Sequence, residues 1–272
     1  MPNLAPTPLV LLAALTACGV NLTPQPEPVP VVPGCVPDRD GVITEAELPI
    51  AFGVTASYYA SPAGATRTVD LAGTDRNWDL SEERADDTVI ALGATPLKDQ
   101  WYADEFPGGE LVVDGGFGLD GVYHQDEQAL WLDGTASREM APAGGRTLIR
   151  YATPIAVLRF PIVDGDAYTS TGQITGGTVV GLPFVGTDVV TVDVTGDGRL
   201  ELPYVRFSPV LRVRTHVVRT PSTGTPVIGR RQALFLFECF GEIARAESRQ
   251  DEPDADFTNA AYLRRFALGV TP

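Results

Sequence analysis

The sequence predicts a mainly β protein, built as a single large curved antiparallel sheet (half-barrel, barrel or sandwich) with few short helices and a C-terminal helix. Three observations predict this fold class. Apolar and polar residues alternate with period two from Ala51 onward, as in half-buried strands. Short gaps with turn residues separate these segments, which suits antiparallel hairpins because parallel strands need long crossovers. Helical periodicity is sparse.

The clearest predicted strand is residues 210–218. Apolar or β-branched side chains at odd positions alternate there with Arg212, Arg214 and His216 at even positions, which predicts one buried and one solvated face. The cationic face could receive an anionic ligand, or pair with carboxylates on neighbouring strands. Four further segments have the pattern of strands: 147–151, 155–160, 188–194 and 233–240.

Turn residues predict the hairpin connections between these strands. Glycine and Asx residues are typical of tight turns, because they tolerate backbone conformations that other residues avoid. The predicted turns are Gly144-Gly145, Asp164-Gly165, Gly176-Gly177, Gly196-Asp197-Gly198 and Ser222-Thr223-Gly224.

Three segments carry helix signals. Thr44 and Glu47 have the spacing of a capping box, which predicts a short helix. Residues 80–87 are a second candidate. Residues 256–268 have acidic residues at their start and apolar side chains at helical spacing, which predicts a C-terminal helix over an edge or opening of the sheet.

The N-terminus predicts export. The apolar run 9–15 is too short to span a bilayer, which needs about 20 apolar residues, but suits a signal-peptide core. It ends in Leu15-Thr16-Ala17-Cys18, which resembles the lipobox of bacterial lipoproteins. The alternative is an apolar N-terminus that ends by chance in a cysteine.

The lipobox resemblance implies a cellular location and the membrane as a partner. Cys18 would be acylated and become the mature N-terminus, so that the protein meets the membrane through a lipid anchor. Gly19 rather than Asp follows this cysteine, which implies the outer membrane rather than retention at the inner one. The face of that membrane stays open.

Composition divides the chain into three predicted parts. Residues 1–17 are the predicted signal peptide. Residues 18–37 are proline-rich with one charge, which is typical of a semi-rigid polyproline II tether. Residues 38–272 show no second linker and no repeat, and we expect a single β-rich domain.

The charge of the chain excludes one class of partner. Lys and Arg number 20 against 35 Asp and Glu, for a net charge of −15. Such a field repels phosphate backbones, so we expect no nucleic acid partner.

Three cysteines are present. With Cys18 assigned to lipid, Cys35 and Cys239 remain, and two leftover cysteines in an exported protein predict one disulfide. In the chain-entropy model a crosslink over so long a loop stabilises by about 4–5 kcal/mol. The alternative is a free, buried Cys239, because its strand is apolar.

A second resemblance covers residues 196–213. The order Gly196-Asp-Gly-Arg-Leu-Glu-Leu-Pro203, followed by Val210-Leu-Arg-Val213, resembles a segment of uncharacterised exported β-rich proteins of gram-negative bacteria. Pro209 stands where that segment has Asn. The resemblance implies a shared β-hairpin core and no known activity.

The segment from Cys35 to Leu48 resembles a degenerate EF-hand loop. With Gly41 at loop position 6, Asp38, Asp40, the Val42 carbonyl, Thr44 and Glu47 occupy the later liganding positions. Position 1 is Val36, which has no side-chain oxygen. Calcium is therefore the one possible cofactor, bound weakly at about 10⁻⁴–10⁻³ M.

The pattern of the same loop also has an interpretation that needs no metal. Residues 38–41 suit a turn, and Thr44 with Glu47 suits a helix cap. A second Asp-Gly segment, residues 193–198, lacks a carboxylate at position 12, and we expect a hairpin turn there.

No catalytic motif identifies a reaction: the sequence contains no G-x-S-x-G, P-loop or H-E-x-x-H. The cluster His124-Gln-Asp126-Glu127 could bind a metal but suits a hairpin tip. Trp78, Trp101, Trp131 and the pair Tyr58-Tyr59 could line a cleft, but core packing is the simpler role.

Two classes of function remain. We favour a non-catalytic, membrane-anchored lipoprotein, a binding or structural module of the cell envelope whose protein, lipid or glycan partner is open. The alternatives are an envelope hydrolase of the glycosidase type, with paired carboxylates, and a weak calcium-binding protein through residues 36–47. A cleft with two facing carboxylates about 5–10 Å apart would favour the hydrolase. An apolar concavity without such carboxylates would favour a lipid or protein binder.

Overall fold

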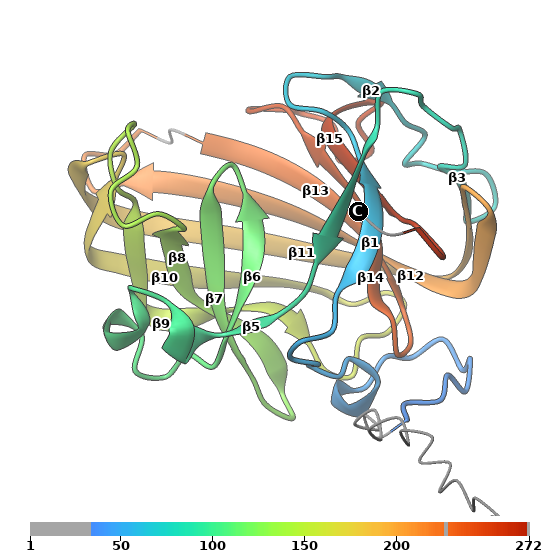
Figure 1. The fold of residues 1–272 in the computed structure, drawn as a ribbon, viewed down its shortest axis with the longest axis horizontal. Helices are drawn as coiled ribbons and strands as arrows, with labels where there is room; N and C mark the ends of the chain where they lie inside the picture. Colours follow the sequence, from blue (N-terminus) through green and yellow to red (C-terminus); the bar gives the residue numbers. More distant parts are fainter. Residues whose placement is uncertain (1–33, 226–227, 271–272) are drawn as a thin grey trace, which may run out of the picture. The chain divides into compact units, whose positions relative to one another are not determined.

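Antiparallel strand pairing dominates the computed structural model, which describes residues 34–225 and 228–270 (Figure 1). Residues 35–272 make up one compact unit. The predicted signal peptide, Cys18 and the tether up to residue 33 lie outside the described residues. Within the described ranges, no helix is long and apolar enough to cross a membrane.

In the part of the chain that the structure describes, the elements are fifteen strands and three short 3₁₀-helices. The helices are η1 (Glu45–Glu47), η2 (Leu97–Asp99) and η3 (Ala103–Glu105). The strands are β1 (Ala56–Ala60), β2 (Arg67–Thr68), β3 (Asn77–Asp79), β4 (Thr88–Leu92), β5 (Thr95–Pro96), β6 (Leu111–Gly116), β7 (Leu119–Gln125), β8 (Ala129–Ser137), β9 (Leu148–Arg159), β10 (Ala167–Val179), β11 (Leu182–Leu202), β12 (Val205–Pro221), β13 (Ile228–Phe237), β14 (Gly241–Ser248) and β15 (Asn259–Phe266).

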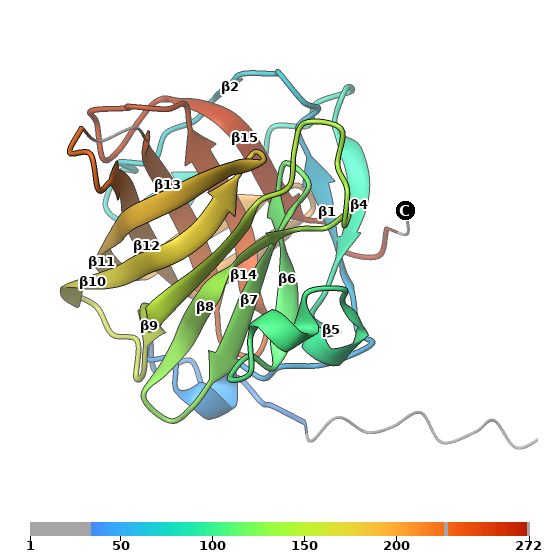
Figure 2. The same cartoon turned by 90° about the vertical axis from the view of Figure 1, so that its left-hand side faces the viewer.

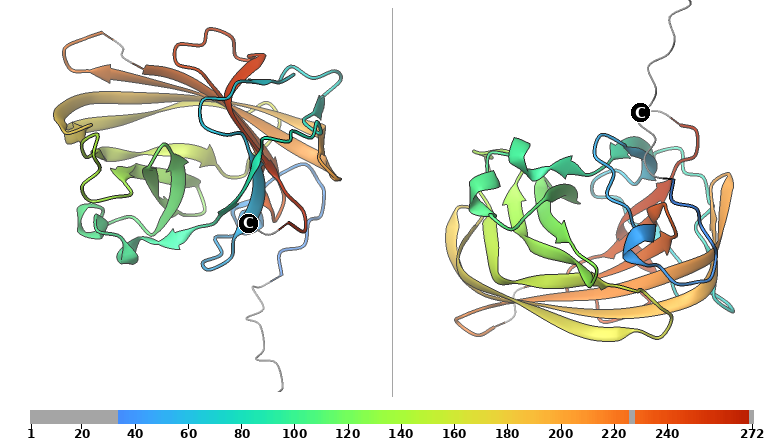
Figure 3. Two further views of the ribbon diagram at one scale, coloured as in Figure 1. Left: turned by 45° about the horizontal axis from the view of Figure 1, so that its top comes forward. Right: turned by 90° about the horizontal axis from the view of Figure 1, so that it is seen from below.

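From β5 to β15 the sheet is a meander, in which each strand pairs with the next along the chain. β1 then pairs with β15 on one side and with β4 on the other, so β4 and β5 are the two edges of an open sheet. Figures 2 and 3 show the strands curving around rather than lying flat. The predicted fold class, one large curved antiparallel sheet, is confirmed.

The predicted C-terminal helix is wrong, because residues 259–266 form β15 between β14 and β1. Residues 80–87 also form no helix. Two backbone carbonyls of that segment, those of Leu80 and Glu82, accept hydrogen bonds from the Arg265 guanidinium. A side chain of β15 therefore donates to backbone carbonyls that would accept hydrogen bonds from backbone N–H groups in a helix.

Two of the predicted turns lie inside strands. Gly196-Asp197-Gly198 falls where the β11–β12 register shifts, and the chain reverses only after Leu202, where Tyr204 has a φ of 66°. A Cβ on Gly198 would stand 2.0 Å from Cζ3 of Trp78. This glycine therefore serves the close packing of a tryptophan rather than a turn. Gly176-Gly177 similarly lies at a register shift in β10.

The sheet has two faces on β11–β15, which we call the outer face and the inner face. The outer face lies under residues 61–87 and carries the largest core, in which Trp78 is 1% exposed. Other members of this core are Leu71, Leu200, Phe235, Ile243 and Phe257. On β6–β8 a separate core packs beneath η2 and η3 around Tyr102 and Phe106.

The inner face changes character along a single row of paired residues. The row runs from β11 to β15 through Val194, Val213, Leu234, Arg245 and Arg264. Its first members belong to an apolar core, whereas its last two are arginines. Along this row, the inner face is thus apolar on β11–β13 and charged on β14–β15.

Candidate functional site

The N-terminal strap, residues 35–48, is the segment that holds the predicted calcium loop, and three kinds of contact bind it to the sheet. A disulfide joins Cys35 to Cys239 with a Cα–Cα distance of 5.4 Å, which confirms the predicted pairing. Ile43 forms a β-bridge with Ile162 and is 2% exposed in the inner core. The Cys239 backbone N–H donates to the carbonyl of Glu47 at 2.8 Å.

Within the strap, two Asx turns shape the acidic loop. The Asp40 N–H donates to Oδ1 of Asp38 at 3.1 Å, and the Val42 N–H donates to Oδ1 of Asp40 at 2.8 Å. Gly41 has a φ of 82°, which suits glycine. The turn that the sequence predicts is therefore present, and it turns both aspartates toward the same region.

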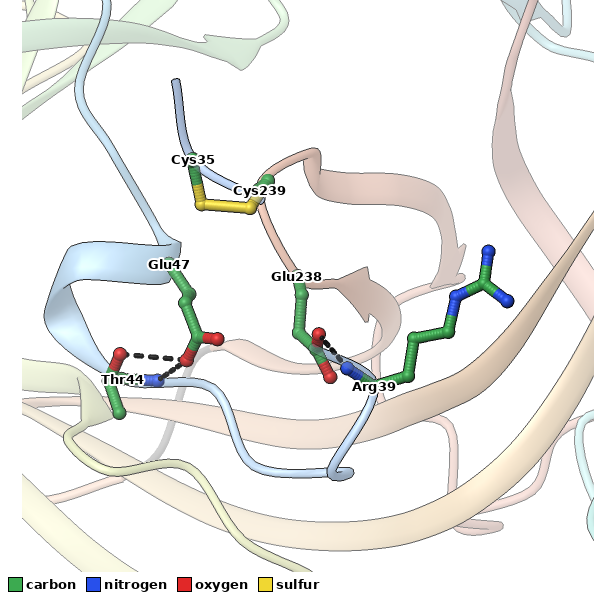
Figure 4. Close-up of a disulfide and its surroundings, with 6 residues drawn as sticks. All are labelled: Cys35, Arg39, Thr44, Glu47, Glu238 and Cys239. Atoms are coloured by element: carbon green, nitrogen blue, oxygen red, sulfur yellow. Dashed lines mark hydrogen bonds between the residues drawn. A yellow bond between two sulfur atoms is a disulfide. The ribbon is translucent and has the colours of Figure 1, made fainter. Parts of the chain in front are cut away.

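Glu47, the predicted bidentate ligand, has another partner. Its Oε2 accepts hydrogen bonds from the Thr44 N–H at 2.9 Å and from the Thr44 hydroxyl at 2.7 Å (Figure 4). This is the capping box at the start of η1. Thr44 and Glu47 therefore serve the helix cap, and Glu47 lies outside the carboxylate group described next.

Glu238 is the residue that sequence reasoning missed. Single oxygens of Asp38, Asp40 and Glu238 all lie within 4.8 Å of one another. Glu238 is only 2% exposed, and its Oε2 accepts a hydrogen bond from the Arg39 N–H at 2.7 Å (Figure 4). Its position next to Cys239 is the one signal that could have found it, because the predicted disulfide brings that turn to the strap.

The second Asp-Gly segment lies beside the first. A Cβ on Gly41 would stand 2.7 Å from Oδ1 of Asp197, so the β11 bulge packs against the acidic loop. Asp193, at the other end of this segment, pairs with Arg214 on β12. The expected hairpin turn at residues 193–198 is wrong, since the segment is part of β11.

The cationic residues of β12 have carboxylate partners. Arg212 and Arg214 bind the two oxygens of Asp256 at 2.9 and 3.0 Å, and Arg214 also binds Asp193. Burial lowers the pKa of Arg212, and Asp256 opposes that effect. Burial also lowers the pKa of His216. The prediction of pairing with a carboxylate on a neighbouring strand holds for Arg214, through Asp193 of β11, whereas the carboxylate partner of Arg212 lies between β14 and β15.

The His124 cluster lies at a hairpin tip, as predicted, between β7 and β8. The His124 ring stacks on Trp131 with centroids 6.1 Å apart, and its Nδ1 lies 2.8 Å from Oδ2 of Asp133. Asp126 accepts hydrogen bonds from two backbone N–H groups of the turn. His124 and Asp126 therefore have local structural roles.

The aromatic residues belong mainly to the packing. Trp78 packs edge-on against Phe235 at 5.3 Å and donates from Nε1 to the Leu71 carbonyl. Trp101 donates to the carbonyl of Ser137 at 3.0 Å, and the Tyr58 hydroxyl donates to that of Glu242 at 2.7 Å. The expected core role is confirmed for Trp78.

An open hollow of about 700 Å³ lies beside edge strand β5. Its lining is mostly apolar, and Phe52 is 49% exposed within it. Three charged side chains, Lys98, Asp104 and Glu110, complete the lining. Such a mixture of apolar wall and few charges is typical of surfaces that bind ligands or partners.

Comparison with known proteins adds no relative. No protein-family model, curated protein or solved structure gives a significant match to this chain. Function therefore has to be argued from the strap, the hollow and the charged inner face themselves.

Proposed function

We propose that this chain is an exported, non-catalytic lipoprotein, anchored in the outer membrane through acylated Cys18, that serves as a binding or structural module of the cell envelope. The lipobox Leu15-Thr16-Ala17-Cys18 supports the anchor. Several acyl chains together anchor stably, because each buried methylene contributes about 0.8 kcal/mol.

The disulfide is the observation that carries this proposal. Apart from Cys18, the chain has only Cys35 and Cys239, and these two pair with each other. Disulfides persist in oxidising compartments and are rare in the cytosol. Pairing of the two leftover cysteines is what export predicts.

The hollow beside β5 supports a binding role for the module. Its mostly apolar lining with exposed Phe52 suits a lipid or protein binder, although two carboxylates, Asp104 and Glu110, also line it.

Replacement of Cys18 tests the anchor. We expect Cys18→Ala to leave an uncleaved precursor or to release the protein from the membrane fraction, as measured by fractionation and intact mass. The double variant Cys35→Ala/Cys239→Ala is the matched control, because it removes two cysteines but should keep the acylated N-terminus. Unchanged mass and membrane retention of Cys18→Ala would contradict the proposal.

A second candidate function is weak calcium binding at the strap. The convergence of Asp38, Asp40 and buried Glu238 within 4.8 Å favours it. Three carboxylates and added water can approach the 6–8 oxygens that calcium prefers. Compared with the EF-hand alignment, Glu238 takes the place of Glu47 as the third carboxylate.

The two glutamates give a matched test. We expect Glu238→Gln to abolish calcium binding, while Glu47→Gln keeps it, because Glu47 serves the helix cap. The measurements are titration calorimetry and the melting temperature at several millimolar calcium against chelator, since a ligand of the folded state raises that temperature. Absence of heat and of any calcium-dependent shift would contradict the second candidate, and loss of binding in Glu47→Gln alone would restore the original ligand set.

A further inference from the structure

The charged part of the inner face contains five residues, which we call the inner patch: Arg230, Glu242, Arg245, Glu247 and Arg264. They come from three neighbouring strands, β13, β14 and β15. Strand register puts them on one face: Arg245 pairs with Arg264, and Glu247 pairs with Gln232, two residues from Arg230.

Strands β7 and β8 lie opposite the inner patch. The charges of Arg245, Glu242 and Arg264 act on the buried phenol of Tyr123 in β7, whose pKa burial raises. Arg230 lies over the ring of Phe117, in the turn before β7, at 5.0 Å. The patch therefore faces other strands of the curved sheet rather than open solvent alone.

The inner patch has a charge opposite to that of the chain. Three arginines and two glutamates give a net charge of 3 − 2 = +1, in a chain of net charge −15. Their burial is substantial, since the side chains of Arg264 and Glu247 are 8% and 6% exposed. An excess positive charge in such a place costs free energy unless an anion compensates it.

The two glutamates of the patch differ in how they are bound. Glu242 accepts hydrogen bonds from Arg245 and Arg264, and both of its oxygens are engaged. Glu247 lies 3.8 Å from Arg230 and 3.8 Å from Arg245, which is too long for a hydrogen bond. No described residue donates a hydrogen bond to Glu247, although it is almost fully buried.

Two further polar atoms on this face have no partner. The Nε of Arg230 and the hydroxyl of Thr135 are buried and make no hydrogen bond. Thr135 pairs with Gly121 in β7, and a Cβ on Gly121 would meet the Tyr123 ring. Thr135 and Tyr123 are therefore on the same face, opposite the inner patch. Buried polar groups in native proteins almost always have a partner.

We propose that the inner patch binds a small anion that also carries hydroxyl groups, of the sugar-acid or sugar-phosphate class. Arg230 has the fork geometry that recognises carboxylate and phosphate. Arg245 donates from Nε and Nη2 to Glu242, so only its Nη1 remains for a ligand. Glu247 can only accept hydrogen bonds when ionised, so a ligand hydroxyl suits it as a donor. Thr135 and Tyr123 supply neutral partners from the opposite strands.

Solvent reaches the patch at one side, which gives a ligand access. The side chain of Arg230 is 36% exposed, whereas Arg245 and Glu242 are 18% and 16% exposed. Arg230 is thus the outermost cation of the patch. It is also the one whose replacement leaves the Glu242 pairs intact.

This inference rests on the proposed binding role and names its ligand class. Titration calorimetry on the full chain uses four probes: glucuronate, glucose 1-phosphate, glucose and inorganic phosphate. We expect one or both sugar anions to bind and glucose not to bind. Whether glucuronate or glucose 1-phosphate binds more tightly identifies the acidic group.

Two variants and two controls locate the site. Arg230→Gln should weaken binding about tenfold or more, because it removes a charge-assisted contact. Thr135→Val should also weaken it. Two control variants lie outside the inner patch and should bind the probe as the wild type does. Arg206→Gln removes an exposed arginine paired with Glu201. Thr171→Val removes an exposed threonine hydroxyl of β10.

Three results would overturn the inference: no heat with either sugar anion at millimolar concentration, inorganic phosphate binding as tightly as both, or Arg230→Gln binding like the wild type. A Thr135→Val variant that melts at a higher temperature and binds normally would assign that hydroxyl to structure alone and remove it from the site. Membrane release of Cys18→Ala is independent of all these results, so the ligand inference can fail while the anchored module stands.

Discussion

The two faces of β14 differ sharply in chemical character. On the outer face, Ile243, Ala244 and Ala246 are all 0% exposed in the largest core. On the inner face, Glu242, Arg245 and Glu247 are also nearly buried but charged. One short strand thus separates an apolar interior from an ionic one.

This difference teaches that alternation identifies which residues share a face, but not which face meets water. A strand with a charged face is ordinarily read as half-exposed. In a curved sheet the charged face can instead turn inward, provided that each charge finds a partner. Here Glu242 accepts hydrogen bonds from two arginines, whereas Glu247 has only two longer ion pairs, each at 3.8 Å.

The largest effect is expected on the outer face. Trp78→Ala should lower the free energy of unfolding by about 3–5 kcal/mol, because it opens a cavity in the core. The glycine beneath the ring, Gly198, has no side chain to fill that cavity. Urea denaturation measures the loss. Trp131→Ala, a half-buried tryptophan at a hairpin, is the control and should cost clearly less; equal losses would contradict the special role of the outer core.

The next effect tests the inner face through pH. Burial opposes ionisation of Glu242, but Arg245 and Arg264 outweigh it and lower its pKa from the ordinary 4.5 to about 2. A carboxyl with a lowered folded-state pKa stabilises above its unfolded pKa, and this contribution is lost as pH falls from about 4.5 to about 2. Its size is about 3 kcal/mol.

Glu242→Gln should therefore lower the free energy of unfolding by about 3 kcal/mol at neutral pH and flatten its dependence on pH between about 4.5 and 2. Urea titrations at a series of pH values measure both effects. A variant that retains the wild-type pH dependence would show that other carboxyls carry it.

The smallest effect is expected for an exposed charge pair outside the outer core and the inner patch. Arg206 and Glu201 pair across β11–β12, and the Arg206 side chain is 62% exposed. Arg206→Gln should change the free energy of unfolding by about 0.5 kcal/mol or less, as exposed ion pairs do. A loss comparable to that of Glu242→Gln would remove the distinction between buried and exposed charges.

The sequence predicted those features that depend on local pattern. Alternation placed the strands at residues 188–194 and 210–218, and Thr44 with Glu47 predicted the cap of η1. Cysteine number and compartment predicted the disulfide. Each of these predictions depends only on residues that are close together in the sequence or on the number of cysteines.

The β15 strand could not be predicted, because its own residues favour a helix. Ala, Leu and Arg are good helix formers. The strand is stabilised instead by β14 and β1 on its two sides. Arg264 and Arg265 point to opposite faces and find Glu242 and Asp87 there, partners that are remote in sequence.

The candidate site was predicted only in part for the same reason. Asp38 and Asp40 were found from their spacing, whereas Glu238 comes from the far end of the chain. The inner patch carries no motif at all. Its residues meet because β13, β14 and β15 pair in a particular register, and the spacing of residues within one strand contains no information on that register.

The position of β1 has a consequence for how the molecule assembles. The first strand pairs with β15, the last, so the ends of the chain must find each other before the sheet is complete. Proteins whose contacts join residues remote in sequence fold slowly, because loop-closure entropy is lost before those contacts form. During vectorial synthesis, β1 can pair early with β4, but its other edge has no partner until β15 has been made. An unpaired strand edge is a template for pairing with other chains, so this edge is the part of the sheet most exposed to mispairing before β15 is in place.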